Sequence, residues 1–357
     1  MRKVVLGQPI GQTVEQRLEW LQQAMAELER ASHDIGEDED GGSGSGATPG
    51  GAAAALNAGI RASLSDATAL TTTDILGASA VWMHPAEHNN IAPYDADEDD
   101  FVVRTFDPTP VGLTTGNHGS GLNFPIFAAW DADNEEMFFG TGPQWSGDRT
   151  VGTGSGTSET ETFRGRLVNK NAITLRNDTT TKTFDARAAL LICGFRTTGA
   201  AQTEDSFAKR LLSNVYYAQE RGLRRTETTD SWSGNANNDW RQYNNSTANA
   251  VEVFQITGSS LVFVEGFGFV STNTQGSAGL ALGLNALTPV ANSFKEVEVI
   301  LTSGGKPLHA MYCDYPGQGH NVFNLLELSG GSGVRTWYGD NGDATRIQTG
   351  LFGRVFG

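Results

Sequence analysis

The heptapeptide Lys295–Leu301, KEVEVIL, alternates polar and apolar residues from Glu296 to Val299. Side chains of a β-strand point alternately to its two faces, so this pattern predicts a half-buried strand. Further runs rich in Val, Ile, Phe and Tyr surround it, and Gly, Asn, Asp or Pro separates most of them. We expect strands at Ile173–Arg176, Ala188–Phe195, Asn249–Thr257, Ser260–Val270, Gly279–Leu284, Glu296–Leu301, Leu308–Tyr312, Val322–Leu328 and Arg335–Tyr338.

Shorter strand-like runs precede this region, at Ala78–Met83, Phe101–Phe106, Phe124–Trp130 and Glu136–Phe139. One segment differs, because Phe207, Leu211 and Val215 of Ser206–Tyr217 have helical spacing, which predicts a single helix at the edge of the sheets. The fold class expected is therefore mainly β, with a small β-rich module at 52–165 and an antiparallel, jelly-roll-like β-sandwich at 166–357.

The N-terminal residues follow another pattern. Thr13 and Gln16 form a capping box, and an apolar seam with heptad spacing follows it, at Val14, Leu18, Leu21, Met25 and Leu28. The seam predicts a coiled-coil helix within residues 1–35 that anchors or oligomerises the chain; packing of the helix on its own domain is the alternative. Residues 36–51, GEDEDGGSGSGATPGG, form an acidic Gly/Ser linker.

Charge and composition exclude several classes of protein. The 357 residues include 25 Lys and Arg and 41 Asp and Glu, for a net charge of −16, which argues against binding to nucleic acid. The charge is uneven: residues 1–163 carry 7 basic and 25 acidic residues, and residues 164–357 carry 18 and 16. No apolar run approaches the ~18 residues of a membrane span, and we expect no secretory signal. The two cysteines, Cys193 and Cys313, are too few for a cysteine zinc site, and we expect both to be buried.

The sequence contains few motifs that are typical of catalytic or metal-binding sites. The spacing of His84 and His88 in HPAEH could suit a metal, but Pro85 and the wrong residue order favour a structural loop. The sequence indicates no catalytic residues, metal or cofactor.

A local group of basic residues is expected to pair with carboxylates such as Glu204 and Asp205, across strands or protomers. It comprises Arg196, Lys209, Arg210, Arg221, Arg224, Arg225 and Arg241. If exposed tryptophans bind sugar, Trp232, Trp240 and Trp337 are the first candidates.

The chain from about residue 64 to its end resembles the virion proteins of tailed bacteriophages that are described as tail fibres, head fibres or spikes. The resemblance rests on four stretches: LSDATALTTTDILGASAVWMHPAEHNNIAPYD (64–95), ARAALLICGFRTTGAAQTEDSFAKRLLSNVYYAQERGLRRTETTDSW (186–232), Asp239-Trp240-Arg241-Gln242, and the ending GQGHNVFNLLELSGG…TWYGDNGD…GLFG. Leu191-Ile192-Cys193-Gly194-Phe195 stands where the family often has a Tyr-Leu-Gly-Thr turn.

The resemblance implies a non-enzymatic appendage on the surface of the virion that contacts a host glycan or protein. It also implies a homo-oligomer, with three chains the usual number, and contact with other virion proteins at the N-terminal anchor. Two alternatives remain open at this stage: a capsid decoration protein that stabilises the shell, and a polysaccharide depolymerase.

Overall fold

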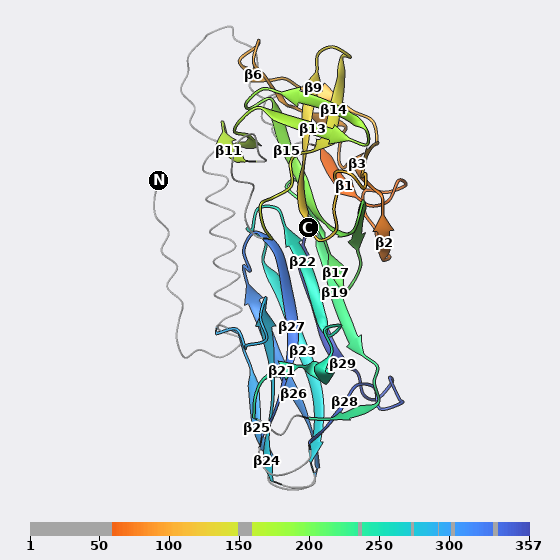
Figure 1. The fold of residues 1–357 in the computed structure, drawn as a ribbon, viewed down its shortest axis with the longest axis vertical. Helices are drawn as coiled ribbons and strands as arrows, with labels where there is room; N and C mark the ends of the chain where they lie inside the picture. Colours follow the sequence, from red (N-terminus) through yellow and green to blue (C-terminus); the bar gives the residue numbers. More distant parts are fainter. Residues whose placement is uncertain are drawn as a thin grey trace, which may run out of the picture. The chain divides into compact units, whose positions relative to one another are not determined.

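The computed structural model describes residues 59–148, 159–234, 238–272, 275–291, 293–300, 304–330 and 335–357. These residues belong to one compact unit, Gly51–Gly357. We refer to residues 59–218 as the N-terminal module and to residues 219–357 as the C-terminal sandwich (Figure 1).

The N-terminal module is built from many short strands and a few long ones. They are β1 (Ile60–Ser63), β2 (Ile75–Ala78), β3 (Ala80–Pro85), β4 (Asn90–Ile91), β5 (Tyr94–Asp95), β6 (Asp100–Phe101), β7 (Arg104–Thr105), β8 (Thr109–Gly112), β9 (Asn123–Asp131), β10 (Glu136–Thr141), β11 (Thr160–Phe163), β12 (Arg166–Asn169), β13 (Ile173–Asn177), β14 (Thr180–Phe184), β15 (Ala189–Gly199), β16 (Gln202–Asp205), β17 (Lys209–Arg210) and β18 (Leu212–Asn214).

The C-terminal sandwich has longer strands and one 3₁₀ turn. Its elements are β19 (Glu220–Glu227), β20 (Ser231–Ser233), β21 (Arg241–Gln242), η1 (Tyr243–Asn245), β22 (Ala250–Gln255), β23 (Val262–Thr272), β24 (Gly276–Leu284), β25 (Glu296–Ile300), β26 (Gly304–Asp314), β27 (Gly319–Gly330), β28 (Arg335–Tyr338) and β29 (Thr349–Phe356).

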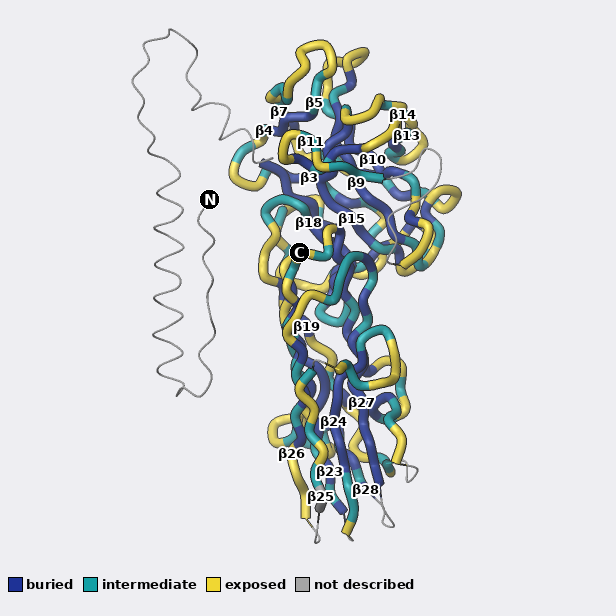
Figure 2. Tube along the Cα trace, turned by 90° about the vertical axis from the view of Figure 1, so that its left-hand side faces the viewer, coloured by how far each residue is buried: buried dark blue, intermediate teal, exposed yellow. Residues whose placement is uncertain are grey.

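Two antiparallel sheets face each other in the sandwich. One has β22, β27, β24 and β25 side by side, and the other has β23 between β26 on one side and β29 and β28 on the other. Alternate residues of both sheets meet in a core that includes Val264, Leu280, Leu325 and Trp337. Figure 2 shows the buried segments running along β24 and β27. The strands predicted from sequence in this region are confirmed, because alternation and β-branched residues report burial on one face.

The two regions share a sheet and a core. A single path of paired strands leads from β15 through β16 and β17 to β22 and β27. Phe254, at the end of β22, packs with Phe127, Trp145 and Leu211 of the N-terminal module. In addition, β9 pairs with β15 and β10 pairs with β13. Strands from both sides of residue 165 therefore belong to one sheet, so the domain boundary predicted there falls within a sheet.

The fold class predicted from the sequence is wrong where it includes helices. The structure contains no α-helix in the residues that it describes, and the predicted coiled coil, residues 1–35, lies outside them. The coiled-coil element therefore has no support. Within the described residues, no helix has the length and apolar character needed to cross a membrane.

The helix predicted at Ser206–Tyr217 is also wrong, since this segment forms β17 and β18. Four consecutive residues, Leu211–Asn214, are buried, so both faces of the segment are covered. A helix with one apolar stripe would expose part of such a run, whereas a strand between two layers buries all of it. Asn214 on β18 also accepts a hydrogen bond from the backbone N–H of Ala62, at 2.7 Å, which ties β18 to β1.

Candidate functional site

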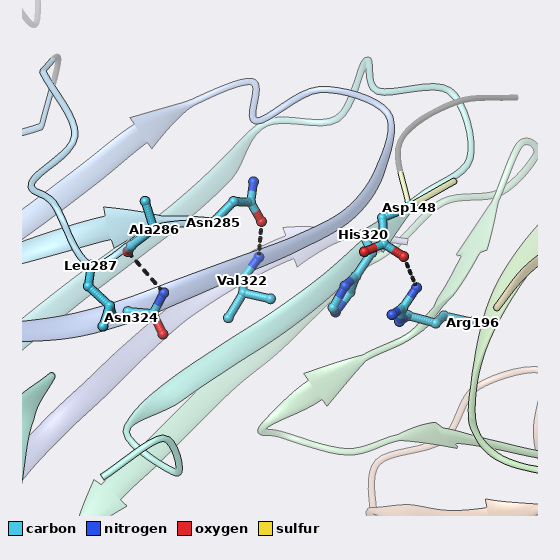
Figure 3. Close-up of a pocket in the computed structure, with 8 residues that line it drawn as sticks. All are labelled: Asp148, Arg196, Asn285, Ala286, Leu287, His320, Val322 and Asn324. Atoms are coloured by element: carbon cyan, nitrogen blue, oxygen red, sulfur yellow. Dashed lines mark hydrogen bonds and ion pairs between the residues drawn. The ribbon is translucent and has the colours of Figure 1, made fainter. Parts of the chain in front are cut away.

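A hollow of about 450 Å³, lined by several polar side chains, lies where the first residues of β27 approach β15. Its volume is within the range of small-ligand sites. Figure 3 shows two groups of side chains, with Arg196, Asp148 and His320 at one end and the asparagines at the other. The lining residues are Asp148, Arg196, Asn285, Ala286, Leu287, His320, Val322 and Asn324.

Arg196 is held in a fixed position at the first end. Its Nη1 donates hydrogen bonds to Asn123 Oδ1 at 3.0 Å and to Asp148 Oδ1 at 2.8 Å. The Asp148 backbone carbonyl accepts from the backbone N–H of His320 at 2.9 Å and from Asn123 Nδ2 at 2.7 Å. These bonds hold the Arg196 guanidinium and the Asp148 carboxylate of the N-terminal module next to the first residues of β27.

His320 is oriented from behind by Glu252 of β22. Its Nε2 lies 2.8 Å from Glu252 Oε2, and Lys209 Nζ lies 3.3 Å from Glu252 Oε1. Burial by itself raises the pKa of Glu252, but the bond to His320 and the charge of Lys209 outweigh it, so the pKa is lowered. The carboxylate therefore stays ionised near neutral pH and fixes the imidazole ring at the wall of the hollow.

Side-chain amides form the second end. Asn285 donates to Asn321 Oδ1 at 3.1 Å and accepts from the backbone N–H of Val322 at 2.9 Å. Asn324 accepts from Gln242 Nε2 at 2.9 Å and donates to the Ala286 carbonyl at 3.2 Å. Amides, a guanidinium, an imidazole and a carboxylate that are locked in this way suit a neutral or weakly acidic ligand with many hydroxyl groups.

A second hollow, of about 530 Å³, lies in the N-terminal module beside Trp130. The Arg104 guanidinium stacks on the Trp130 ring at 4.1 Å from its centroid, and Glu135, Glu136 and Asp107 line the same hollow. Arg104 covers one face of the Trp130 ring, so a sugar in this hollow would contact the rest of the ring and the carboxylates beside it.

The tryptophans singled out from the sequence lie elsewhere. Trp337 is fully buried in the sandwich core, where its Nε1 donates to Ser329 Oγ at 3.0 Å, so it offers no face to a sugar. Trp232 is half-buried, packs edge-on against Tyr243 and donates to Glu327 Oε2 at 2.8 Å. Trp240 is half-buried beside Gly279. The predicted anchor residues Val14, Leu18, Leu21, Met25 and Leu28 lie outside the described residues.

His84 and His88 have structural contacts. His84 is buried with Nε2 at 2.7 Å from the Ser65 carbonyl, and His88 Nδ1 accepts from the backbone N–H of Asn90 at 3.2 Å. Within the described part of the chain, no group of three or more His, Cys, Asp or Glu residues is placed to hold a metal ion. Cys193 is buried as expected, but Cys313 is exposed on β26, so that prediction is wrong for one of the two cysteines.

Part of the predicted pairing of the basic residues is present. Asp205 is buried and binds Arg210 Nη1 at 3.1 Å and Arg221 Nη2 at 2.5 Å. Arg196, Lys209 and Arg241 pair with Asp148, Glu252 and Glu327, which the sequence analysis did not connect with them. His320 and Asn324 belong to the stretch GQGHNVFNLLELSGG that carried the resemblance, yet nothing in their spacing marks them as a site.

No protein-family model matches the chain, and no curated protein matches it. Among solved structures, it is similar to a tryptic core variant of the Cry1Da toxin of Bacillus thuringiensis, at 7% identity over 79% of this chain, with a TM-score of 0.17. It is also similar to the mosquito-larvicidal Cry4Aa toxin of the same organism, at 9% identity over 76% of this chain, with a TM-score of 0.13. The chain spans about half the length of these structures (51% and 54%). At such TM-scores the similarity carries no argument.

Proposed function

We propose that this protein is a structural appendage of a tailed-bacteriophage virion, of the tail-fibre or head-fibre type, whose β-structure contacts the host surface. The observation that carries the proposal is the resemblance of residues 186–232, which covers β15 to β19 and the start of β20. These strands join the N-terminal module to the C-terminal sandwich, so the stretch of sequence that most resembles the family also organises this fold.

The chemistry of the two hollows supports contact with a host glycan. One offers Arg196, His320 and asparagine amides, and the other offers Trp130 with carboxylates. A single shallow site of this kind binds weakly, but several copies on one particle raise the effective concentration and give firm attachment.

Antibody labelling of intact particles of the encoding phage, viewed by electron microscopy, tests the virion role. Antibody raised against residues 166–357 is expected to label the tail tip, the collar or discrete fibres on the head. Uniform label over the whole head would favour a capsid decoration protein. No label on intact or partly disrupted particles would contradict the proposal.

Binding to host envelope glycans tests the hollow beside β27. We expect Arg196→Ala to weaken retention on these glycans by about tenfold, because a charge-assisted hydrogen bond contributes about 1.5–3 kcal/mol. The control is Arg164→Ala, which removes an exposed arginine paired with Asp99 in the N-terminal module and is expected to leave retention unchanged.

Equal retention by both variants would exclude the hollow as the contact site. Release of reducing ends during the incubation would instead indicate a depolymerase.

A further inference from the structure

The outer surface of one sandwich sheet carries the large apolar residues that a strand normally turns inward. Along β23, Val262, Val264 and Val270 point into the core, together with Gly266 and Gly268. The residues between them include three phenylalanines, Phe263, Phe267 and Phe269, which point outward. A sheet face that meets water normally carries polar residues at these positions.

Neighbouring strands extend this surface. Phe267 lies in ring contact with Phe352 of β29 at 5.9 Å and stacks on His309 of β26 at 4.8 Å between centroids. Phe294, just before β25, is also in ring contact with His309, at 5.9 Å between centroids. We call this surface the aromatic face; its principal residues are Phe263, Phe267, Phe269, Phe294, Phe352 and Phe356.

Most of the exposed apolar area of the aromatic face comes from three residues. Phe267, Phe294 and Phe356 are 39%, 52% and 43% exposed. With about 200 Å² for each aromatic side chain, these three residues alone expose roughly 270 Å². Patches of about 300–600 Å² are the largest on typical monomers, and a stable interface covers about 800 Å² of each partner. With the half-buried phenylalanines the exposed area falls within the range of these large patches, which suits the apolar centre of an interface rather than its full extent.

Charge indicates which partner fits. The chain as a whole carries −16, so two copies repel each other at most approaches. On the aromatic face, however, acidic and basic groups lie in pairs: Arg354 with Glu220 at 3.4 Å, and His309 Nε2 with Glu265 at 3.7 Å. The positive and negative charges of this surface are therefore locally balanced. Each of them has a complementary charge on the same surface of a second copy.

We propose that the aromatic face is an interface with a second copy of this chain, formed by the C-terminal sandwich itself. The argument depends on the sheet and its charges alone, so it stands whether or not the protein belongs to a virion.

The native cysteines give a direct probe. Cys313 pairs in register with Phe263 and is exposed in the single chain, at the margin of the aromatic face. Cys193 is buried, and burial raises the pKa of its thiol, so it reacts slowly with thiol reagents. Maleimide labelling of the native protein therefore reports mainly on Cys313.

The experiment combines solution mass, by light scattering, with the rate of Cys313 labelling. The wild-type protein is expected to be oligomeric with Cys313 protected. Phe267→Asp should raise the apparent dissociation constant at least ~30-fold, as for loss of an interface hot spot, and expose Cys313. The matched control is Leu76→Asp, because Leu76 is 68% exposed on β2 in the other sheet. It should keep the wild-type mass.

Circular dichroism and thermal melting check that both variants are folded, and Phe352→Asp replaces Phe267→Asp if the latter is not. An oligomer that both face variants leave intact would overturn the proposal. A monomeric wild-type protein would also overturn it. If Cys313 of that monomer were protected, the aromatic face would be covered by the chain's own N-terminal residues or by another protein; if Cys313 were reactive, the face would be open to solvent.

Discussion

The N-terminal module and the C-terminal sandwich differ in the length of their strands. The sandwich has long strands, such as the 11 residues of β23 and the 12 of β27, around a core of apolar side chains. The module contains five strands of only two residues, β4 to β7 and β17. Both regions bury some charged side chains, such as Arg61 and Asp205 in the module and Glu327 and Arg335 in the sandwich. Short strands satisfy few backbone groups by pairing, so side chains have to satisfy the rest.

Arg61 shows how one buried side chain does this. It is 1% exposed, and its guanidinium donates to the backbone carbonyls of Ala69 at 3.0 Å, Tyr217 and Gly357 at 3.0 Å. These bonds tie β1 to the segments before β19 and after β29. Burial, with a smaller contribution from Arg221, lowers the pKa of Arg61 to about 10. Asp205 is the nearby carboxylate that offsets this concentration of positive charge.

The largest effect is therefore expected from Asp205→Ala. Removal of the carboxylate leaves Arg210 and Arg221 buried without their countercharge, which should lower the free energy of unfolding by about 3–5 kcal/mol. Urea denaturation measures the change. Asp99→Asn is the control, because Asp99 is exposed and its loss should leave the midpoint unchanged. A loss below ~1 kcal/mol for Asp205→Ala would mean that the buried charges do not stabilise the module.

A buried polar group in the sandwich should matter less. The Tyr243 hydroxyl donates to the Tyr338 carbonyl at 3.1 Å, and that carbonyl also accepts from Thr349 Oγ1 at 3.0 Å. Tyr243→Phe should therefore cost only about 1 kcal/mol, since the carbonyl keeps a partner. Tyr315→Phe, at a 59% exposed position, is the matched control. A loss as large as that of Asp205→Ala would remove the contrast between the two regions.

The smallest effect is a pH dependence with opposite signs at two glutamates. The pKa of Glu252 is lowered, so its ionised form contributes stability above about pH 4.5 that is lost as pH falls through the folded-state pKa. Burial raises the pKa of Glu327, so stability falls as pH rises from about 4.5 through its higher folded-state pKa. The stability difference between wild type and Glu252→Gln should grow with pH, and that for Glu327→Gln should shrink.

Urea midpoints measured between about pH 3 and pH 7 separate the two cases. If the stability difference from wild type changed with pH in the same direction for both variants, burial would not distinguish these two carboxylates.

The sequence predicted the long strands well and the short ones poorly. Val, Ile and Phe at alternate positions located strands such as β22, β25 and β27, because one face of each strand meets a single core. The strands β17 and β18 were predicted as a helix, since Phe207, Leu211 and Val215 happen to have helical spacing while both faces of the segment are covered. Non-local contacts such as that of Asn214 with Ala62 decide the structure there.

The candidate sites depend even more on contacts between distant residues. Arg196, Asp148 and His320 are far apart in the chain and meet only when β27 approaches β15. Trp337 was a candidate for a sugar contact because sequence alone cannot separate a core tryptophan from a surface one, and the structure buries it. The outward phenylalanines of β23 were part of a predicted strand, but which of its faces is inside became clear only from the sheet partners.

The central claim, that this chain is a component of a virion, is tested most directly by quantitative mass spectrometry of gradient-purified phage particles. The account predicts peptides from residues 59–357 in every particle fraction, at a fixed ratio to the major capsid protein that survives washing in high salt. Detection of the protein in lysates of infected cells, together with its absence from purified particles, would contradict the account.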